Sequence, residues 1–273
     1  MNAATTSSFP NSFFDELAAA EDRHFWFRAR NRLIGRVLAQ LVATLPPDFL
    51  ALEIGTGTGN VLRVLERACC RARVVGMEFF DEGLRHAQQR TSTPLVRGDV
   101  FRLPFLGPVH LVGMFDVLEH LSDDCEALRQ IHKILGSDGV LLLTVPAYMT
   151  LWSEFDEFSG HFRRYTPKSL RAALTESGFQ VDYLSPFMLT LAPLVWTMRR
   201  RFRSETDDGR LSERIAKHFR IPLVVNETML ALLTCEIPLV ARRAHLPFGS
   251  SILAIGRKRV SQVVDRPAYD PRR

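Results

Sequence analysis

The chain has 273 residues, of which 46% are hydrophobic and 24% are charged. These proportions exclude a collagen-like, low-complexity or disordered chain, because they provide enough apolar material for a sizeable core. No run of about 18 uncharged apolar residues is present, which argues against a conventional membrane-spanning helix. The N-terminal residues have neither the basic nor the apolar region of a secretory signal, so we expect a cytoplasmic protein.

Charge is distributed unevenly along the chain. The net charge is +5, with −2 over residues 1–150 and +7 over residues 151–273. A basic second half suits a phosphate-bearing, nucleic-acid or membrane-surface partner, or a solvated arginine-rich face. The four cysteines form no CxxC pair, which indicates reduced thiols and neither a disulfide framework nor a metal site.

The predicted elements begin with a helix over residues 12–44. Apolar residues recur there at helical spacing from Phe13 to Leu41, and Pro46 ends the pattern. Beyond it, short apolar runs alternate with segments of helical periodicity. Strands are predicted at 50–54, 74–77, 95–96, 110–114, 140–145, 180–184 and 251–255, and helices at 61–69, 81–89, 124–135 and 167–177.

Strands that alternate with helices of this length indicate βαβ units, and therefore a mostly parallel sheet with helices on both faces. The run 140–145 is apolar without a break, which is typical of a strand buried on both faces. We expect an α/β fold with a helical lid over 1–48, a core over 49–185, a helical cap inserted at 186–247, the last core strand at 248–260 and a flexible tail at 261–273.

The insertion at 186–247 interrupts the alternation. It has two apolar stretches on either side of an arginine cluster, and such surfaces suit contact with anionic membrane headgroups. The interpretation we favour is a helical cap that packs on itself or on a second subunit, because the stretches contain prolines and are too short to span a membrane. The clustered residues are Arg199, Arg200, Arg201 and Arg203.

A glycine-rich turn follows the predicted strand 50–54 and opens the next helix. Gly55, Gly57 and Gly59 allow a tight turn and a close approach of the backbone to a ligand at a helix N-terminus. Their spacing differs from the GxGxxG of dinucleotide-binding turns. Glu53 stands just before them, where a carboxylate would repel a pyrophosphate and attract an ammonium group. Taken alone, the pattern also suits an ordinary βα turn.

Two further acidic residues end the next predicted strands. Glu78 lies 23 residues after Gly55, close to the ~20-residue offset at which an acidic side chain bonds ribose hydroxyls. Asp99 could accept a hydrogen bond from an adenine amino group. Because the carboxyl ends of parallel strands share one edge, we expect the three acids to meet at the edge where such folds bind ligands.

Five segments in this order resemble the class I S-adenosylmethionine (SAM)-dependent methyltransferases: LEIGTGTGN, VVGMEFFDEGL, RGDVFRLPF, FDVLEHLSD and LGSDGVLLLTVPA. The resemblance covers residues 50–185 and 250–257. It implies a Rossmann-like, seven-stranded, mostly parallel sheet that binds SAM and releases S-adenosylhomocysteine. The family more often has Asp where this chain has Glu53 and Glu78, and Glu keeps the charge.

The resemblance also assigns roles along the cofactor. The glycine turn and Glu53 would line the methionine end of SAM. The segment 24–30 is either a lid that places an arginine on the SAM carboxylate or a helix that packs in the core. The implied SAM contacts are Glu53, Gly55, Thr56, Gly57 and Gly59 at the methionine end, Glu78 at the ribose, Phe79, Asp99 and Val100 at the adenine, and Phe115 and Asp116 near the sulfonium.

The acceptor side is predicted from residues that follow the fourth and fifth core strands. His161 could take a proton from a hydroxyl, because imidazole titrates near neutral pH. His120 is the alternative candidate for the base, or it is a structural residue that orients its turn. Trp152, Arg164 and Tyr165 are the predicted acceptor contacts, with a structural histidine and solvated arginines as the alternative. No metal ligand is assigned, and a Mg²⁺ requirement, seen in some relatives, stays open.

These features predict methyl transfer from SAM to a small, hydrophobic, aromatic or lipid-like acceptor. Oxygen is the favoured target, because LEHL at 118–121 is similar to the ubiquinone-pathway-type O-methyltransferases. Only charge favours a nucleic-acid methyltransferase, and no NPPY-type base-flipping motif or RNA-binding module is present. A non-catalytic SAM-binding regulatory protein is the other alternative. A homodimer and peripheral membrane contact through 186–247 stay open.

Overall fold

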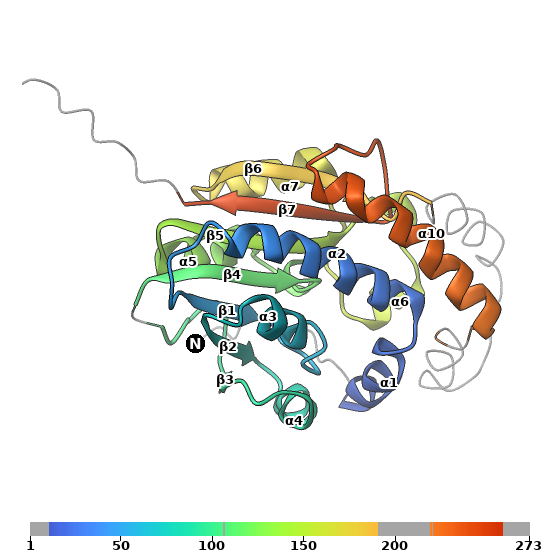
Figure 1. The fold of residues 1–273 in the computed structure, drawn as a ribbon, viewed down its shortest axis with the longest axis horizontal. Coiled ribbons are helices and arrows are strands. Elements are labelled where there is room, and N and C mark those ends of the chain that lie inside the picture. The colour runs from blue at the N-terminus through green and yellow to red at the C-terminus, as the bar shows by residue number, and fades with distance from the viewer. Residues whose placement is uncertain (1–10, 106, 191–218, 220, 259–273) are drawn as a thin grey trace, which may run out of the picture.

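The computed structural model describes residues 11–105, 107–190, 219 and 221–258. Within them, one seven-stranded sheet has the order β3-β2-β1-β4-β5-β7-β6 (Figure 1). Six strands run in one direction, and β7 lies antiparallel between β5 and β6. The mostly parallel sheet is confirmed. The strands are β1 Leu50–Ile54, β2 Arg73–Glu78, β3 Leu95–Arg97, β4 Val109–Phe115, β5 Leu135–Pro146, β6 Gln180–Phe187 and β7 Ser251–Arg257.

Helices cover both faces of this sheet. Helices α2, α3 and α10 pack on one face, and α5 and α7 pack on the other, as the two buried clusters show. Helix α1 lies against α4 beside the glycine turn. The helices are α1 Asn11–Glu21, α2 Phe25–Val42, α3 Leu62–Ala68, α4 Asp81–Arg90, α5 Asp124–Ile134, α6 Glu154–Phe158, α7 Pro167–Glu176 and α10 Leu223–Ala241, with 3-10 turns η1 Leu118–His120 and η2 Met149–Leu151.

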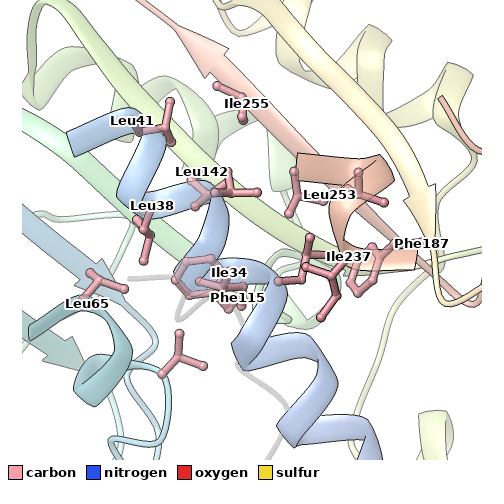
Figure 2. Close-up of a cluster of buried hydrophobic side chains, with 14 of the residues drawn as sticks. Ile34, Leu38, Leu41, Leu65, Phe115, Leu142, Phe187, Ile237, Leu253 and Ile255 are labelled. Atoms are coloured by element: carbon pink, nitrogen blue, oxygen red, sulfur yellow. The ribbon is translucent and has the colours of Figure 1, made fainter. Parts of the chain in front are cut away.

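The central strands are buried on both faces, so their apolar residues divide between two cores. In β4, Leu111 and Phe115 point to the face covered by α2, whereas Val112 and Met114 point to α5 and α7. Figure 2 shows the first core, in which Ile34 of α2 packs close to Phe115. A continuous apolar run is therefore required in these strands, because successive side chains alternate between the faces.

The predicted helix over 12–44 is two helices. Helix α1 ends at Glu21, and His24 begins α2 by accepting a hydrogen bond from the Trp26 backbone N–H at 3.2 Å. An imidazole that caps the second helix stabilises the break, which apolar spacing alone does not reveal. Further along, β5 starts at Leu135, one residue inside the predicted helix, because the Leu135 backbone already pairs with β4.

The predicted cap is described only in part. Residues 191–218 and 220, which include the arginine cluster, and the predicted tail at 261–273 lie outside the described residues. Helix α10 packs against α2, where Asn226 accepts from the Phe25 backbone N–H at 2.8 Å and donates to the Arg23 carbonyl at 2.9 Å. The core strand β6 continues to Phe187, so the inserted segment starts later than predicted.

Helix α10 is the one described helix that is long and apolar enough to cross a membrane by length and composition. The sequence analysis argued against a spanning segment because no run of about 18 apolar residues is free of charge, and because the apolar stretches of the insertion contain prolines and are short. The helix runs through Glu227 and Glu236 without a break, and Glu236 is buried against the end of β6. The helix also exposes several large apolar side chains, which are Leu223, Val224, Val225, Leu232 and Leu239.

Candidate functional site

A cavity of about 780 Å³ lies at the carboxyl ends of β1, β2, β4 and β5. Residues at these strand ends, among them Ile54, Glu78, Phe115 and Pro146, form its floor, and residues of α1, α2 and α10 form its walls. Parallel α/β sheets place ligands at this edge. The cavity brings together all the predicted SAM contacts except Gly59, which lies next to it in the turn.

The glycine turn is shaped by close packing at its ends and is open in its middle. Gly55 has a φ of 74°, and a Cβ there would come within 2.3 Å of Val117. A Cβ added at Gly59, which has a φ of 82°, would lie 3.1 Å from the Ala87 Cα. Gly57 also has a positive φ, 54°, yet a Cβ there meets no atom within 4 Å. The turn therefore presents bare backbone to the cavity at Gly57.

Glu53 is the residue that best tests the cofactor assignment. Its side chain is buried, and its Oε2 has no hydrogen-bond partner among the described residues. Burial raises the pKa of the Glu53 carboxyl well above its usual range, an effect that the Arg30 charge partly opposes. A buried acceptor without a donor carries a desolvation penalty. The ammonium group of SAM supplies both a donor and a charge, so this carboxylate fits the cofactor.

Glu78 and Asp99 both hold their own loops. The Glu78 carboxylate accepts hydrogen bonds from the backbone N–H groups of Gly57 at 2.7 Å, Phe79 at 2.9 Å and Phe80 at 3.0 Å. Burial raises the pKa of this carboxyl, and the backbone donors oppose the shift. Asp99 accepts from the Phe101 N–H at 2.9 Å. The contacts to ribose and adenine thus stay predictions, made by carboxylates that already fix the turns around them.

The other predicted SAM contacts differ in their surroundings. Thr56 is buried, and its hydroxyl donates to the Met77 carbonyl at 3.3 Å. Phe79 is 39% exposed at the rim of the cavity, whereas Val100 is buried beside it. Phe115 lines the cavity and also belongs to the core shown in Figure 2. Phe79 and Val100 thus lie together at the cavity, as a pair that flanks the adenine ring must, and their contact with adenine and that of Phe115 with the sulfonium stay predictions.

Asp116 forms an ion pair that the sequence analysis did not identify. Arg30 of α2 donates to Asp116 Oδ2 at 2.6 Å, and its guanidinium lies 4.9 Å from the Trp26 ring centroid. The Arg30 side chain is 7% exposed and lines the cavity. The segment 24–30 was predicted to be either a lid or a core helix. Arg30 lies on the buried face of α2 with Leu33 and Ile34 and also lines the cavity, and an arginine contact with the SAM carboxylate stays a prediction.

A second polar group lies on the acceptor side of the cavity. His161 Nδ1 lies 2.8 Å from Asp156 Oδ1, and Asp156 is fully buried. Arg164 donates to both Asp156 oxygens, at 2.6 and 3.0 Å, which together with His161 lowers the pKa of the Asp156 carboxyl despite its burial. The His161 ring packs edge-to-face on His120, with centroids 4.5 Å apart. Burial lowers the His120 pKa to about 3.

Two predicted acceptor contacts are not brought to the cavity. Tyr165 is buried, and its hydroxyl donates to Asp124 Oδ2 at 2.7 Å at the start of α5. Trp152 donates from its indole nitrogen to Glu157 at 3.2 Å. Neither lies among the cavity-lining residues, whereas His161, His120 and Arg164 do. Aromatic residues in a loop beside a cavity can either contact the acceptor or anchor the loop to the protein. Sequence spacing does not distinguish an acceptor contact from an anchor.

Sequence reasoning missed several cavity residues. Glu119 stands inside the LEHL segment and was not assigned a role, although it is 1% exposed and lines the cavity. Asp156, which bonds His161 and Arg164 but does not itself line the cavity, was not assigned a role either. Further aromatic wall residues come from distant segments, so no local motif identifies them. They include Phe13, Phe14, Phe155 and Phe219.

Comparisons with known proteins agree with this geometry. A family model described as "Methyltransferase domain" matches residues 26–184. A Mycolicibacterium smegmatis protein named "Probable S-adenosylmethionine-dependent methyltransferase" is 26% identical over 183 residues, 66% of this chain and 68% of that protein. A demethylmenaquinone methyltransferase of Thermotoga maritima is 24% identical over 197 residues, 58% of this chain and 83% of that protein.

The fold also has solved counterparts. One is a Haemonchus contortus phosphoethanolamine N-methyltransferase, solved with phosphomonomethylethanolamine and S-adenosylhomocysteine. Its TM-score is 0.52 at 14% sequence identity, and the match covers 81% of this chain and 52% of that chain. This likeness concerns the fold alone.

Proposed function

Because the chain belongs to the class I SAM-dependent methyltransferases, we propose that it methylates an oxygen of a small, hydrophobic or lipid-like acceptor. SAM is its cofactor and S-adenosylhomocysteine the product. The observation that carries the acceptor proposal is that polar and aromatic side chains line the same cavity. His161 and Glu119 belong to the polar part of the lining, and phenylalanines are frequent in the rest.

The apolar walls support an acceptor that is largely hydrophobic. Helix α10 contributes Val225 and Met229 to the cavity, and Val225 is also 46% exposed. The cavity is therefore continuous with the exposed apolar side of α10. A long apolar substituent could pass along this side while its reacting group stays inside. The demethylmenaquinone named for the Thermotoga maritima relative is itself a hydrophobic molecule, which supports this class of acceptor.

SAM, when bound, supplies a methyl group on a sulfonium sulfur, which keeps the electron pair of the broken S–C bond while the acceptor oxygen forms the new C–O bond. The residues of this chain have three tasks. Glu53 and the glycine turn hold the methionine end, the aromatic walls exclude water, and the polar group receives the acceptor hydroxyl.

His161 is the proposed proton acceptor. Its Nδ1 faces the Asp156 carboxylate at 2.8 Å, and a carboxylate partner fixes the ring with the proton on that nitrogen. The lone pair is then on Nε2. The hydroxyl proton would pass to this nitrogen as the C–O bond forms. Arg164 keeps Asp156 ionised and in place through its two hydrogen bonds.

The localisation and contacts of the chain follow from the same proposal. We place it in the cytoplasm, with peripheral membrane contact through the segment 186–247. The exposed residues Leu223 and Val224 at the start of α10 support such contact, because an interfacial helix buries apolar side chains among the headgroups. The proposed partner is a small-molecule acceptor, and a homodimer through the same surface is the competing arrangement.

The test is an acceptor screen with SAM labelled in its methyl group. The panel contains alkylated phenols, prenylated phenols, small amines and tRNA. We expect label in phenol oxygens, identified by mass spectrometry, with larger rates for the alkylated and prenylated compounds. Methylation only of the amines, of ring carbon or of tRNA would contradict the proposal.

A variant pair tests the assigned residue. His161→Gln should lower the rate by about 10²–10⁴-fold, the usual contribution of a general base, and should leave S-adenosylhomocysteine binding unchanged. His86→Gln, on α4 outside the cavity, is the control and should retain full activity.

A further inference from the structure

Glu119 is a buried carboxylate in the cavity lining that no arginine or lysine among the described residues pairs with. It is 1% exposed, and its Oε2 has no hydrogen-bond partner in the part of the chain that the structure describes. Its acidic neighbours differ, because Asp116 is paired with Arg30 and Asp156 with Arg164, both at 2.6 Å. Arg30 and Arg164, which both line the cavity, are thus committed to other carboxylates. The ionisation of Glu119 therefore depends on the charge that a ligand brings.

Several charged and titratable groups face Glu119 from the elements around it. Burial, and next the charge of Asp116, raise the pKa of the Glu119 carboxyl well above its usual range, and the charge of Asp156 adds to this shift. The Arg164 charge and the backbone of Glu119 itself oppose it. The carboxyl therefore favours its neutral form while the cavity holds no cation. The facing groups are Asp116 after β4, His120 in η1, and Asp156, His161, Arg164 and Tyr165 between β5 and α7.

The charge near this carboxylate differs between the two forms of the cofactor. SAM has a positive sulfonium where S-adenosylhomocysteine has a neutral thioether, and both have the same ammonium and carboxylate groups. The predicted neighbour of the sulfonium is Asp116, which lines the same cavity and whose charge already acts on Glu119. A positive charge beside Asp116 favours the ionised form of Glu119, because charges interact strongly in a buried site. Loss of that charge restores the neutral form.

We propose that Glu119 stores the proton of the acceptor hydroxyl: it is ionised while a sulfonium occupies the cavity and is protonated once methyl transfer has left a thioether. His161 Nε2 first takes the hydroxyl proton as the C–O bond forms, and the electron pair of the broken S–C bond stays on sulfur. The proton then passes from His161 to the Glu119 carboxylate. A positive charge on sulfur and a negative charge on Glu119 disappear together, so the net charge of the cavity stays constant.

The positions of the two groups allow this transfer. A ring nitrogen of His161 and a carboxylate oxygen of Glu119 lie within 4.8 Å of each other. One water hydrogen-bonded to both atoms at about 2.8 Å can bridge such a separation. The Phe162 backbone N–H donates to the Glu119 carbonyl at 2.8 Å and holds the two segments together. The inference rests on the proposed function, because His161 remains the proton acceptor, and it adds where that proton goes next.

The experiment counts the protons that leave the protein when a cofactor binds, with no acceptor present. SAM and S-adenosylhomocysteine are each titrated by calorimetry between pH 6 and pH 7, where the ammonium groups of both ligands are protonated. Two buffers with different enthalpies of ionisation are used, and the difference in heat gives the number of protons released. We expect SAM to release up to about one proton more than S-adenosylhomocysteine. Protons released by groups at the ammonium end cancel in this difference, since both ligands have that group.

A pair of variants assigns the extra proton. Glu119→Gln keeps the size of the side chain and resembles its neutral form, so it should fold, which circular dichroism checks. It should release no extra proton with SAM, and its preference for SAM over S-adenosylhomocysteine should fall about 10-fold, the factor that corresponds to one unit of pKa. Glu53→Gln is the matched control. It should weaken the binding of both ligands and keep the difference in proton release.

Two results would overturn the inference. One is an equal proton release by SAM and S-adenosylhomocysteine in the wild type. The other is a difference that persists in folded Glu119→Gln, and its loss in His161→Gln would then assign the proton to the imidazole. In either case methylation of a phenol that still depends on His161 would leave the proposed function standing, because proton release is measured without any acceptor.

Discussion

At the scale of single residues, the chemistry of the cavity depends on where carboxylates lack partners. Glu53 has a buried oxygen without a donor among the described residues, at the position proposed for the SAM ammonium group. Glu78 has three backbone donors of its own. Two glutamates at neighbouring strand ends therefore differ: the proposed role of Glu53 is to bind the ammonium charge, whereas Glu78 holds a turn.

Glu53→Gln should weaken binding of S-adenosylhomocysteine by roughly 10–100-fold, because a hydrogen bond to a charged group contributes about 1.5–3 kcal/mol. Isothermal calorimetry measures the dissociation constant. Glu82→Gln, on the surface of α4 away from the cavity, is the matched control. An unchanged constant for Glu53→Gln in folded protein would remove Glu53 from the cofactor site.

The glycine turn offers a second residue-scale prediction, because two of its positions share a positive φ and differ in space. Gly55→Ala should lose about 1–2 kcal/mol of unfolding free energy from the left-handed backbone and about 1–3 kcal/mol more from the clash with Val117. Gly57→Ala should lose only the ~1–2 kcal/mol that comes from the left-handed backbone. Its main effect should be weaker cofactor binding, since its new methyl group enters the cavity.

Urea unfolding without ligand measures the difference in unfolding free energy between the two variants. Calorimetry with S-adenosylhomocysteine measures the difference in cofactor binding. Equal stability of the two variants would show that Val117 yields to the added methyl group.

Residue roles were only partly predictable from the sequence. The glycines and strand-end acids could be assigned because backbone conformation and strand ends leave local patterns. The pairing of Arg30 with Asp116 joins residues 86 positions apart, and the burial of Glu119 depends on a loop that begins some 40 residues later. Neither leaves a signal in the nearby sequence.

At the scale of elements, helix α10 shows how acidic residues can lie in an apolar helix. Glu236 accepts from the Leu189 backbone N–H at 2.9 Å and is 7% exposed. It therefore ties the helix to the chain that leaves β6. The sequence could not predict this contact, because hydropathy does not show which backbone donors a buried carboxylate will meet.

Burial raises the pKa of the Glu236 carboxyl, and the backbone donors at Leu189 and its neighbours oppose the shift. Its folded pKa thus lies above its unfolded value. The stability of the wild type should be fully present below the unfolded pKa and should decline as pH rises through the folded pKa. Glu236→Gln should lack this decline, so its stability relative to the wild type should rise between pH 4 and pH 8.

Urea unfolding at several pH values measures this difference. Glu227→Gln, at an exposed position of the same helix, is the control. A pH-independent difference for Glu236→Gln would mean that Glu236 keeps an ordinary pKa in the fold.

At the scale of the whole molecule, the first helix closes the cavity from outside the sheet. Arg90 of α4 donates to Glu21 Oε2 at 2.6 Å and to the Ala18 carbonyl at 2.6 Å. Glu21 also accepts from the Thr58 hydroxyl in the glycine turn. Helix α1 is therefore tied both to α4 and to the turn, while its Phe13, Phe14 and Leu17 line the cavity.

Arg90→Gln should release α1, because it leaves Glu21 buried without its charged partner. We expect limited proteolysis near residues 18–24 to become at least several-fold faster, and S-adenosylhomocysteine to slow it in both proteins. Arg85→Gln is the control, since Arg85 is exposed and pairs only with Glu82 among the described residues. Equal cleavage rates would show that other contacts hold α1.

The parallel sheet and its ligand-binding edge could be predicted from the alternation of strands and helices. The division between α1 and α2 could not be predicted, because the imidazole cap at His24 is a single contact within a continuous apolar pattern. The packing of α10 on α2 could not be predicted either, since it joins segments about 200 residues apart.

The antiparallel pairing of β7 with the edge strand β6 has a consequence for how such chains can diverge. Phe187 and Ser251 are paired in register, so the chain leaves β6 and re-enters β7 at neighbouring points. The segment between them is a side branch whose removal would leave a simple hairpin. Because the predicted SAM contacts lie at or just beyond the ends of β1, β2, β3 and β4, we expect that exchanging this branch changes the choice of acceptor while SAM binding is kept.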